Sequence, residues 1–250
     1  MEFSDHFLHY IHCTKNGKSF YKIFSHFSNK INIKLKKGEK KLTVKWTNKD
    51  FEVFTTPGLE QRMSALIKNV RPKFEELGTT FSTYFSSKIG EEFYPHVAKH
   101  ARRKVNPPID SWVAFATNKR GYKALPHFEI GLFKSHIFIL LCAIYEAPTK
   151  KEIASNLLNN VNSFNELPET FFITGDHFDP NGIPLVDAMK DGSLEKLLTR
   201  LRDVKKGEFM IGLQLPKEKT VKLSAKEFEK IAEETFDALI PIYNIMVNKK

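Results

Sequence analysis

The sequence predicts an α+β fold, in which a single domain holds a mainly antiparallel central sheet of about five or six strands with packed helices. Consecutive β-type segments in the middle of the chain, with helical patterns on either side, argue against a doubly wound parallel sheet. Two of these segments are separated only by Lys134 and Ser135, the length of a tight hairpin. Hydrophobic residues make up 41% of the chain, which is enough for a packed core.

The predicted strands are short apolar or alternating segments. IFILLCAIY, residues 137–145, is apolar without alternation, which predicts a central strand covered on both faces. This run is far shorter than the roughly 20 residues of a membrane-spanning helix, so we expect no membrane segment. The five predicted strands are residues 111–116, 128–133, 136–145, 171–174 and 208–215.

Helical periodicity predicts helices before and after these strands. The first begins near Thr56, and Pro72 should kink or split it. A second ends at Gly90, a residue that suits the left-handed position after a helix. Three further helices are expected to begin at the capping box Thr149-x-x-Glu152, near Ser193, and at the capping box Ser224-x-x-Glu227.

The first 41 residues differ in composition from the rest of the chain. They contain no Ala, Val, Pro or Arg, and their last codons can spell a ribosome-binding sequence followed by Leu42, whose TTG codon can start translation in bacteria. We therefore expect residues 1–41 to be a non-native or disordered extension with a mis-assigned start, and residues 42–250 to be the domain. Metal binding by His6, His9, His12 and Cys13 is the alternative, but no carboxylate or second cysteine completes the set.

Positive charge is concentrated in one segment of the domain. The formal net charge is +10, of which residues 1–41 carry +6, so residues 42–250 carry +4. Residues 94–127 alone carry +6, and the rest of the domain is slightly acidic. Because the charge is concentrated there, we expect a site in this segment.

The segment FYPHVAKHARRKVNPPIDSWVAFATNKRGYKALPHFEIG, residues 93–131, resembles the signature block of the YktB-like family of small bacterial proteins. The resemblance continues through GLEQRM (58–63), RPKFEELG (71–78), GDH (175–177), VKKGEF (204–209) and EETFD (233–237). It covers residues 46–250 and implies a single bacterial domain that begins near Leu42. It supplies no catalytic residues, so whether the protein is an enzyme stays open.

The basic segment predicts a site for an anionic or phosphorylated small molecule. Arginine offers a planar fork that matches phosphate or carboxylate, and lysine and histidine add further donors. The loop around Gly121 lies between two predicted strands, a common place for ligand contacts. The candidate residues are Lys99, His100, Arg102, Arg103, Arg120, Lys123 and His127.

Two alternatives to anion binding remain open. Aromatic residues interleave with the charges, so a nucleic-acid-binding module is possible, with bases stacked on Tyr94, Trp112, Phe115, Tyr122 and Phe128. A structural or interaction protein without a ligand would use the same charges as a solvated face.

We expect no metal and no cofactor. His96 and His100 could share a metal on a helix but not on a strand, and the metalloprotease motif His-Glu-x-x-His is absent. Cys142 lies in an apolar segment and is expected in the core. Only two cysteines are present, which favours a reducing cytoplasm. The sequence does not indicate an oligomeric state.

Overall fold

An antiparallel sheet organises the part of the chain that the structure, a computed structural model, describes, which is residues 42–249. Within this part the sheet has seven strands in the order β1-β2-β3-β4-β7-β5-β6, and each neighbouring pair is antiparallel. The strands are β1 (Tyr94–Val97), β2 (Asp110–Ala116), β3 (His127–Phe133), β4 (His136–Ala143), β5 (Phe172–Thr174), β6 (Ile183–Pro184) and β7 (Phe209–Pro216). The predicted α+β class is confirmed.

All five predicted strands are present, as β2, β3, β4, β5 and β7. The sheet exceeds the predicted five or six strands because β1 and β6 were missed. Both are short edge strands that contain a proline, at Pro95 and Pro184. Proline is tolerated at a sheet edge but weakens the sequence signal of a strand. The central place of β4 is confirmed, since all eight of its residues are buried.

The first predicted helix is split before Pro72, as expected. Helix α3 (Leu59–Ala65) continues into a π-helical turn, η2 (Leu66–Val70), and then into α4 (Arg71–Ile89). A π-turn places the proline, which cannot donate a backbone hydrogen bond, within the first turn of α4. The second predicted helix is not separate but forms the end of α4, which stops at Gly90, whose φ of 77° is the predicted left-handed cap. The start near Thr56 was wrong by a few residues, because Gly58 precedes α3.

The other predicted helices are α5 (Lys150–Asn159), α7 (Ser193–Asp203) and α9 (Ala225–Met246). The capping box at Ser224 is formed, with both reciprocal hydrogen bonds to Glu227. At Thr149 the helix starts as predicted, but the threonine side chain makes no capping hydrogen bond. Short helical segments were not predicted: α2 (Asn48–Glu52), η1 (Val53–Thr55), η3 (Val161–Glu166), α6 (Leu185–Lys190) and α8 (Lys217–Thr220).

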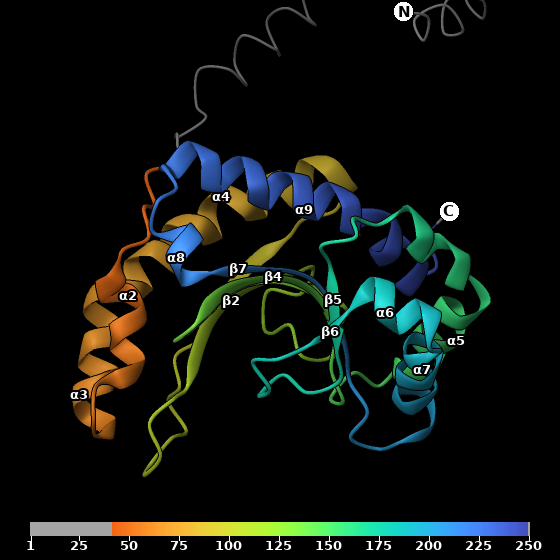
Figure 1. Ribbon diagram of the computed structural model, residues 1–250, viewed down its shortest axis with the longest axis horizontal. Helices are drawn as coiled ribbons and strands as arrows, with labels where there is room; N and C mark the ends of the chain where they lie inside the picture. The colour runs from red at the N-terminus through yellow and green to blue at the C-terminus, as the bar shows by residue number, and fades with distance from the viewer. Residues whose placement is uncertain (1–41, 250) are drawn as a thin grey trace, which may run out of the picture. The chain divides into compact units, whose positions relative to one another are not determined.

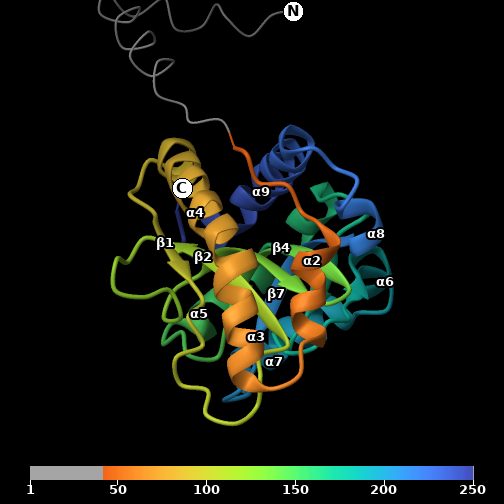
Figure 2. The same ribbon diagram turned by 90° about the vertical axis from the view of Figure 1, so that its left-hand side faces the viewer.

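Helices α4 and α9 lie across one face of the curved sheet, as Figure 1 and Figure 2 both show. Side chains alternate along each strand, so the residues that face these helices form the main core. At its centre Phe85 of α4 stacks on Phe128 of β3 with ring centroids 4.3 Å apart, and Phe236 of α9 packs edge-on against both. The opposite face carries a smaller apolar cluster that includes Phe138, Leu140 and Met210. That face is the one with room for a ligand.

Two predictions fall outside the described residues. These are the extension at residues 1–41 and the alternative metal ligands within it, and both stay predictions. Within residues 42–249, none of the helices is both long and apolar enough to cross a membrane.

Candidate functional site

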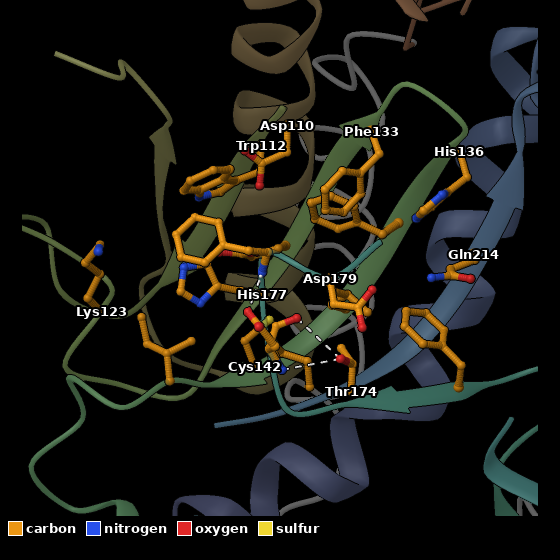
Figure 3. A pocket seen from close by; sticks show the side chains of 18 of the residues that line it. Asp110, Trp112, Lys123, Phe133, His136, Cys142, Thr174, His177, Asp179 and Gln214 are labelled. Carbon is orange, nitrogen blue, oxygen red and sulfur yellow. Dashed lines mark hydrogen bonds between the residues drawn. The ribbon is translucent and has the colours of Figure 1, made fainter. Parts of the chain in front are cut away.

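A cavity of about 170 Å³ opens on the sheet face opposite α4 and α9. Its floor is apolar and is built from Phe138 and Leu140 of β4, Phe172 of β5 and Met210 of β7. Along each strand these residues alternate with residues that belong to the main core, so they face the other side of the sheet. Figure 3 shows polar side chains around this floor that come from different elements, among them Asp110, His136 and His177.

Asp110, at the start of β2, is a buried carboxylate in the cavity wall. Its residue is only 2% exposed, and among residues 42–249 Oδ1 has no hydrogen-bond partner. Burial and the nearby Glu129 raise the pKa of Asp110 to about 6, although the charges of Arg103 and His177 act in the opposite direction. A carboxylate left buried and unpaired is costly, so this side chain requires a functional explanation.

His136 forms another polar part of the wall, at the start of β4. Its Nδ1 lies 2.8 Å from Ser135 Oγ, while Nε2 is buried without a hydrogen-bond partner in the described chain. Burial lowers the pKa of His136 to about 4, so the ring is neutral near pH 7. A neutral imidazole can offer a donor or an acceptor to a ligand.

The loop after β5 forms one rim of the cavity, with Asp176, His177, Phe178 and Asp179 lining it. His177 Nδ1 lies 2.7 Å from Oε2 of the buried Glu208. Burial lowers the pKa of His177, but the hydrogen bond and charge of Glu208 outweigh it, so the pKa is raised. Burial raises the pKa of Glu208, but the hydrogen bond and charge of His177 outweigh burial, so the pKa of Glu208 is lowered. The two groups therefore form an ion pair that anchors the rim.

The structure brings together only part of the predicted basic site. Arg103 and Lys123 line the cavity, and Lys123 Nζ is paired with Glu146 Oε1 at 2.8 Å. Lys99, Arg102 and Arg120 are exposed and are not among the residues that line it. The predicted gathering of all these cations around one ligand is therefore absent from the described chain, because the connecting loops direct several of them to solvent.

His100 supports the cavity wall without lining it. Its backbone has a positive φ of 51°, its Nε2 lies 3.2 Å from Ser111 Oγ, and its ring meets Trp112 edge-on. Trp112 in turn donates a hydrogen bond from Nε1 to the Tyr122 hydroxyl at 2.9 Å. His96 is held separately by the Asn118 carbonyl at 2.9 Å. The metal pair considered for His96 and His100 is not formed.

His127 is fully buried beneath the cavity, beside Glu129 and Cys142. Cys142 belongs to the smaller apolar cluster, so its predicted core position is confirmed, but it also lines the cavity. Sequence reasoning missed several site residues: Asp110, Glu129, His136 and Cys142. Polar residues at every second position of a strand, as at His127 and Glu129, were the signal that could have found some of them.

The comparisons with known proteins show the family to which the chain belongs. Residues 46–243 match the family model described as "Domain of unknown function (DUF1054)". The chain belongs to the DUF1054 family. It is 60% identical over 206 residues to a "UPF0637 protein" of Lysinibacillus sphaericus (strain C3-41). The aligned stretch covers 82% of this chain and 97% of the relative. DUF1054 membership fits the YktB-like resemblance noted in the sequence.

Other relatives in the DUF1054 comparison are also bacterial. A "UPF0637 protein" of Macrococcus caseolyticus (strain JCSC5402) is 48% identical over 198 residues, which cover 79% of this chain and 97% of the relative. A UPF0637 protein of Staphylococcus aureus (strain MSSA476) is 46% identical over 197 residues, 78% of this chain and 96% of the relative. The names of these relatives state no activity.

Proposed function

We propose that the protein binds a small molecule with an apolar body and at least one hydrogen-bond-donating or cationic group in the cavity on the open face of the sheet. The observation that carries this proposal is Asp110, whose buried Oδ1 lacks a hydrogen-bond partner within residues 42–249. A ligand that donates to this oxygen would offset the cost of its burial.

The size and lining of the cavity limit the ligand. A cavity of ~150 Å³ can hold benzene in an apolar protein interior, so the volume of about 170 Å³ fits a single ring or the end of a larger molecule. Trp112 and Phe133 belong to the lining, and aromatic faces favour flat or cationic groups. The neutral His136 ring supplies a second polar contact.

The charge of the lining favours a neutral or cationic ligand over the anionic ligand expected from the sequence. The lining has three cations, Arg103, Lys123 and the His177 ring that pairs with Glu208, and four carboxylates, those of Asp110, Glu129, Asp176 and Asp179. An anionic ligand is the second candidate, favoured by Arg103. In the described chain its guanidinium makes only a long hydrogen bond, 3.4 Å, to the Asn106 carbonyl.

Nucleic-acid binding receives less support from the arrangement of the aromatic residues. Phe115 and Phe128 are fully buried in the main core and cannot stack on bases. The predicted cytoplasmic location is compatible with the reduced state of Cys142 and stays a prediction.

The proposal is tested by thermal shift and calorimetry on the full-length chain. One panel contains aromatic amines, guanidines and nitrogen heterocycles, and the other contains nucleotides and sugar phosphates. A ligand at ~100 times its Kd stabilises the protein by about 2.7 kcal/mol, which is a readily measured shift. We expect a hit from the first panel that Asp110→Asn abolishes.

Arg103→Ala and Arg102→Ala form a matched pair, since only Arg103 lines the cavity. Hits from the anionic panel alone, lost in Arg103→Ala and kept in Arg102→Ala, would support the second candidate. If neither panel shifts the melting temperature, the small-molecule proposal is contradicted.

A further inference from the structure

Three chemically different metal-ligand groups meet on the cavity side of two paired strands. His127 of β3 and Cys142 of β4 are directly opposite each other in the strand register. Glu129 lies two residues beyond His127 on β3, so its side chain points to the same face. One ligand atom from each of the three residues lies within 4.8 Å of the other two.

His127 is oriented as a metal-binding histidine would be. Its Nδ1 lies 2.7 Å from the Leu125 backbone carbonyl, which can only accept, so Nδ1 carries the proton and donates. In the neutral ring Nε2 then presents a lone pair. Metal-binding histidines usually donate their other N–H to a carbonyl or carboxylate in this way, which fixes the tautomer and the ring orientation.

The Nε2 atom of His127 has no hydrogen-bond partner in the described chain, although the residue is completely buried. Oε1 of Glu129 is 3.2 Å away, but the two atoms do not form a hydrogen bond. Because this distance is short enough for a hydrogen bond, the bond must be absent for reasons of angle: an N–H on Nε2 would not point at the oxygen. A cation placed between the bare nitrogen and the carboxylate would attract both groups, which a misaligned proton does poorly.

The separation between Nε2 of His127 and Oε1 of Glu129 fits a zinc ion. Zinc bonds of about 2.0–2.1 Å to nitrogen and oxygen and about 2.3 Å to sulfur place tetrahedral ligand atoms roughly 3.3–3.6 Å apart. The Nε2–Oε1 separation of 3.2 Å is close to that spacing. A set of imidazole, carboxylate and thiolate suits zinc, whereas magnesium and calcium require oxygen ligands.

We propose that His127, Glu129 and Cys142 bind a zinc ion on the inner wall of the cavity. Cys142 loses its thiol proton to solvent on binding, and zinc takes the thiolate, the imidazole Nε2 and a carboxylate oxygen. Because Glu129 and Cys142 line the cavity, the fourth position faces it and is open to water or another ligand. This proposal revises the sequence-based expectation of no metal and does not depend on the small-molecule proposal.

A second group in the described chain, Asp176, His177 and Glu208, could also hold a metal by distance. Each of its three residues already has a partner through one atom, although Glu208 Oε1 has no hydrogen-bond partner in the described chain. His177 Nδ1 is paired with Glu208 Oε2, and Asp176 Oδ1 accepts a hydrogen bond from the Phe178 backbone at 2.8 Å. The first group is therefore the stronger candidate, and the second supplies a control.

The test uses Co²⁺ and Zn²⁺ with the full-length chain after chelator treatment. The chain has only two cysteines, so in a Cys13→Ser background any thiolate–cobalt charge-transfer band must come from Cys142. We expect this band with stoichiometric Co²⁺, together with the intense visible bands of tetrahedral coordination. We also expect Zn²⁺ to displace the cobalt and abolish both signals.

Matched carboxylate-to-amide variants then identify the ligands. Glu129→Gln should weaken zinc binding by at least ~100-fold, given that loss of an outer partner alone costs ~10–100-fold. Asp176→Asn, in the second group, should leave the affinity unchanged. Circular dichroism confirms that each variant is folded, and Glu129→Gln still tests the site if Cys142→Ser does not fold.

The proposal is overturned by the absence of a thiolate band in the Cys13→Ser chain. It is also overturned if Glu129→Gln binds zinc as tightly as the parent, or if Asp176→Asn weakens binding to the same extent.

Discussion

Asp110 shows at the scale of one residue how a site proposed for binding can cost stability. The residue is 2% exposed, and burial is the largest cause of its raised pKa. Because the folded pKa of about 6 lies above the ordinary value of 3.8, the folded state holds this proton more tightly than the unfolded state. Stability from this group is therefore present at low pH and is lost as pH rises from about 4 to 6.

We predict that Asp110→Asn stabilises the ligand-free protein by roughly 1–2 kcal/mol at pH 7, because it removes a buried charge, each pKa unit being worth ~1.4 kcal/mol. The gain should vanish near pH 4, where the native carboxyl is already protonated. Urea unfolding of both proteins at the two pH values measures this difference. A loss of stability at pH 7 would mean that the carboxylate has a structural partner.

Capping provides a comparison at the scale of the element. The sequence contains two capping boxes, at Thr149 and Ser224, and the structure forms only the second. Thr149 has a φ of −89° and a ψ of 10°, whereas a capping side chain requires the extended backbone that Ser224 adopts. The preceding chain therefore decides whether a capping sequence is used.

Ser224→Ala should destabilise the protein by ~0.5–2 kcal/mol, since it leaves the Glu227 backbone N–H without the hydroxyl oxygen that now accepts from it. Thr149→Ala is the control and should change the unfolding free energy by less than about 0.5 kcal/mol, as surface substitutions usually do. Denaturant unfolding curves distinguish the two. Equal losses would show that Thr149 caps α5 in solution.

At the same scale, most helices and strands could be predicted because their signals are local. The hairpin at Lys134 and Ser135, the end of α4 at Gly90 and the break before Pro72 each depend on a few neighbouring residues. The candidate site was harder to predict from the sequence. Its candidates came from a charged segment, whereas the cavity takes residues from β2, β3, β4, β5, β7 and the loop after β5.

At the scale of the whole described domain, the two faces of the sheet have different roles. Helices α4 and α9 cover one face (Figure 1), where aromatic rings pack closely. The other face carries a smaller apolar cluster and an open cavity. Phe85 contacts rings from both the sheet and α9 and is fully buried. It therefore links the helical layer to the sheet.

Phe85→Ala should cost ~3–5 kcal/mol, because truncation removes buried area and leaves a cavity between the two layers. Phe178→Ala is the matched control on the open face, since Phe178 is 51% exposed at the cavity rim. It should change stability by less than about 0.5 kcal/mol. Similar losses for both variants would contradict this assignment of the two faces.

The sequence by itself determined the α+β class, five of the strands, the main helices and the family resemblance. These follow from periodicity, caps and turn residues, which depend on interactions between near neighbours. Only the tertiary structure decided that His127 lies opposite Cys142 and that His177 reaches the cavity beside Asp110. Strand order and register depend on contacts between distant segments, and the same local pattern is compatible with several arrangements of them.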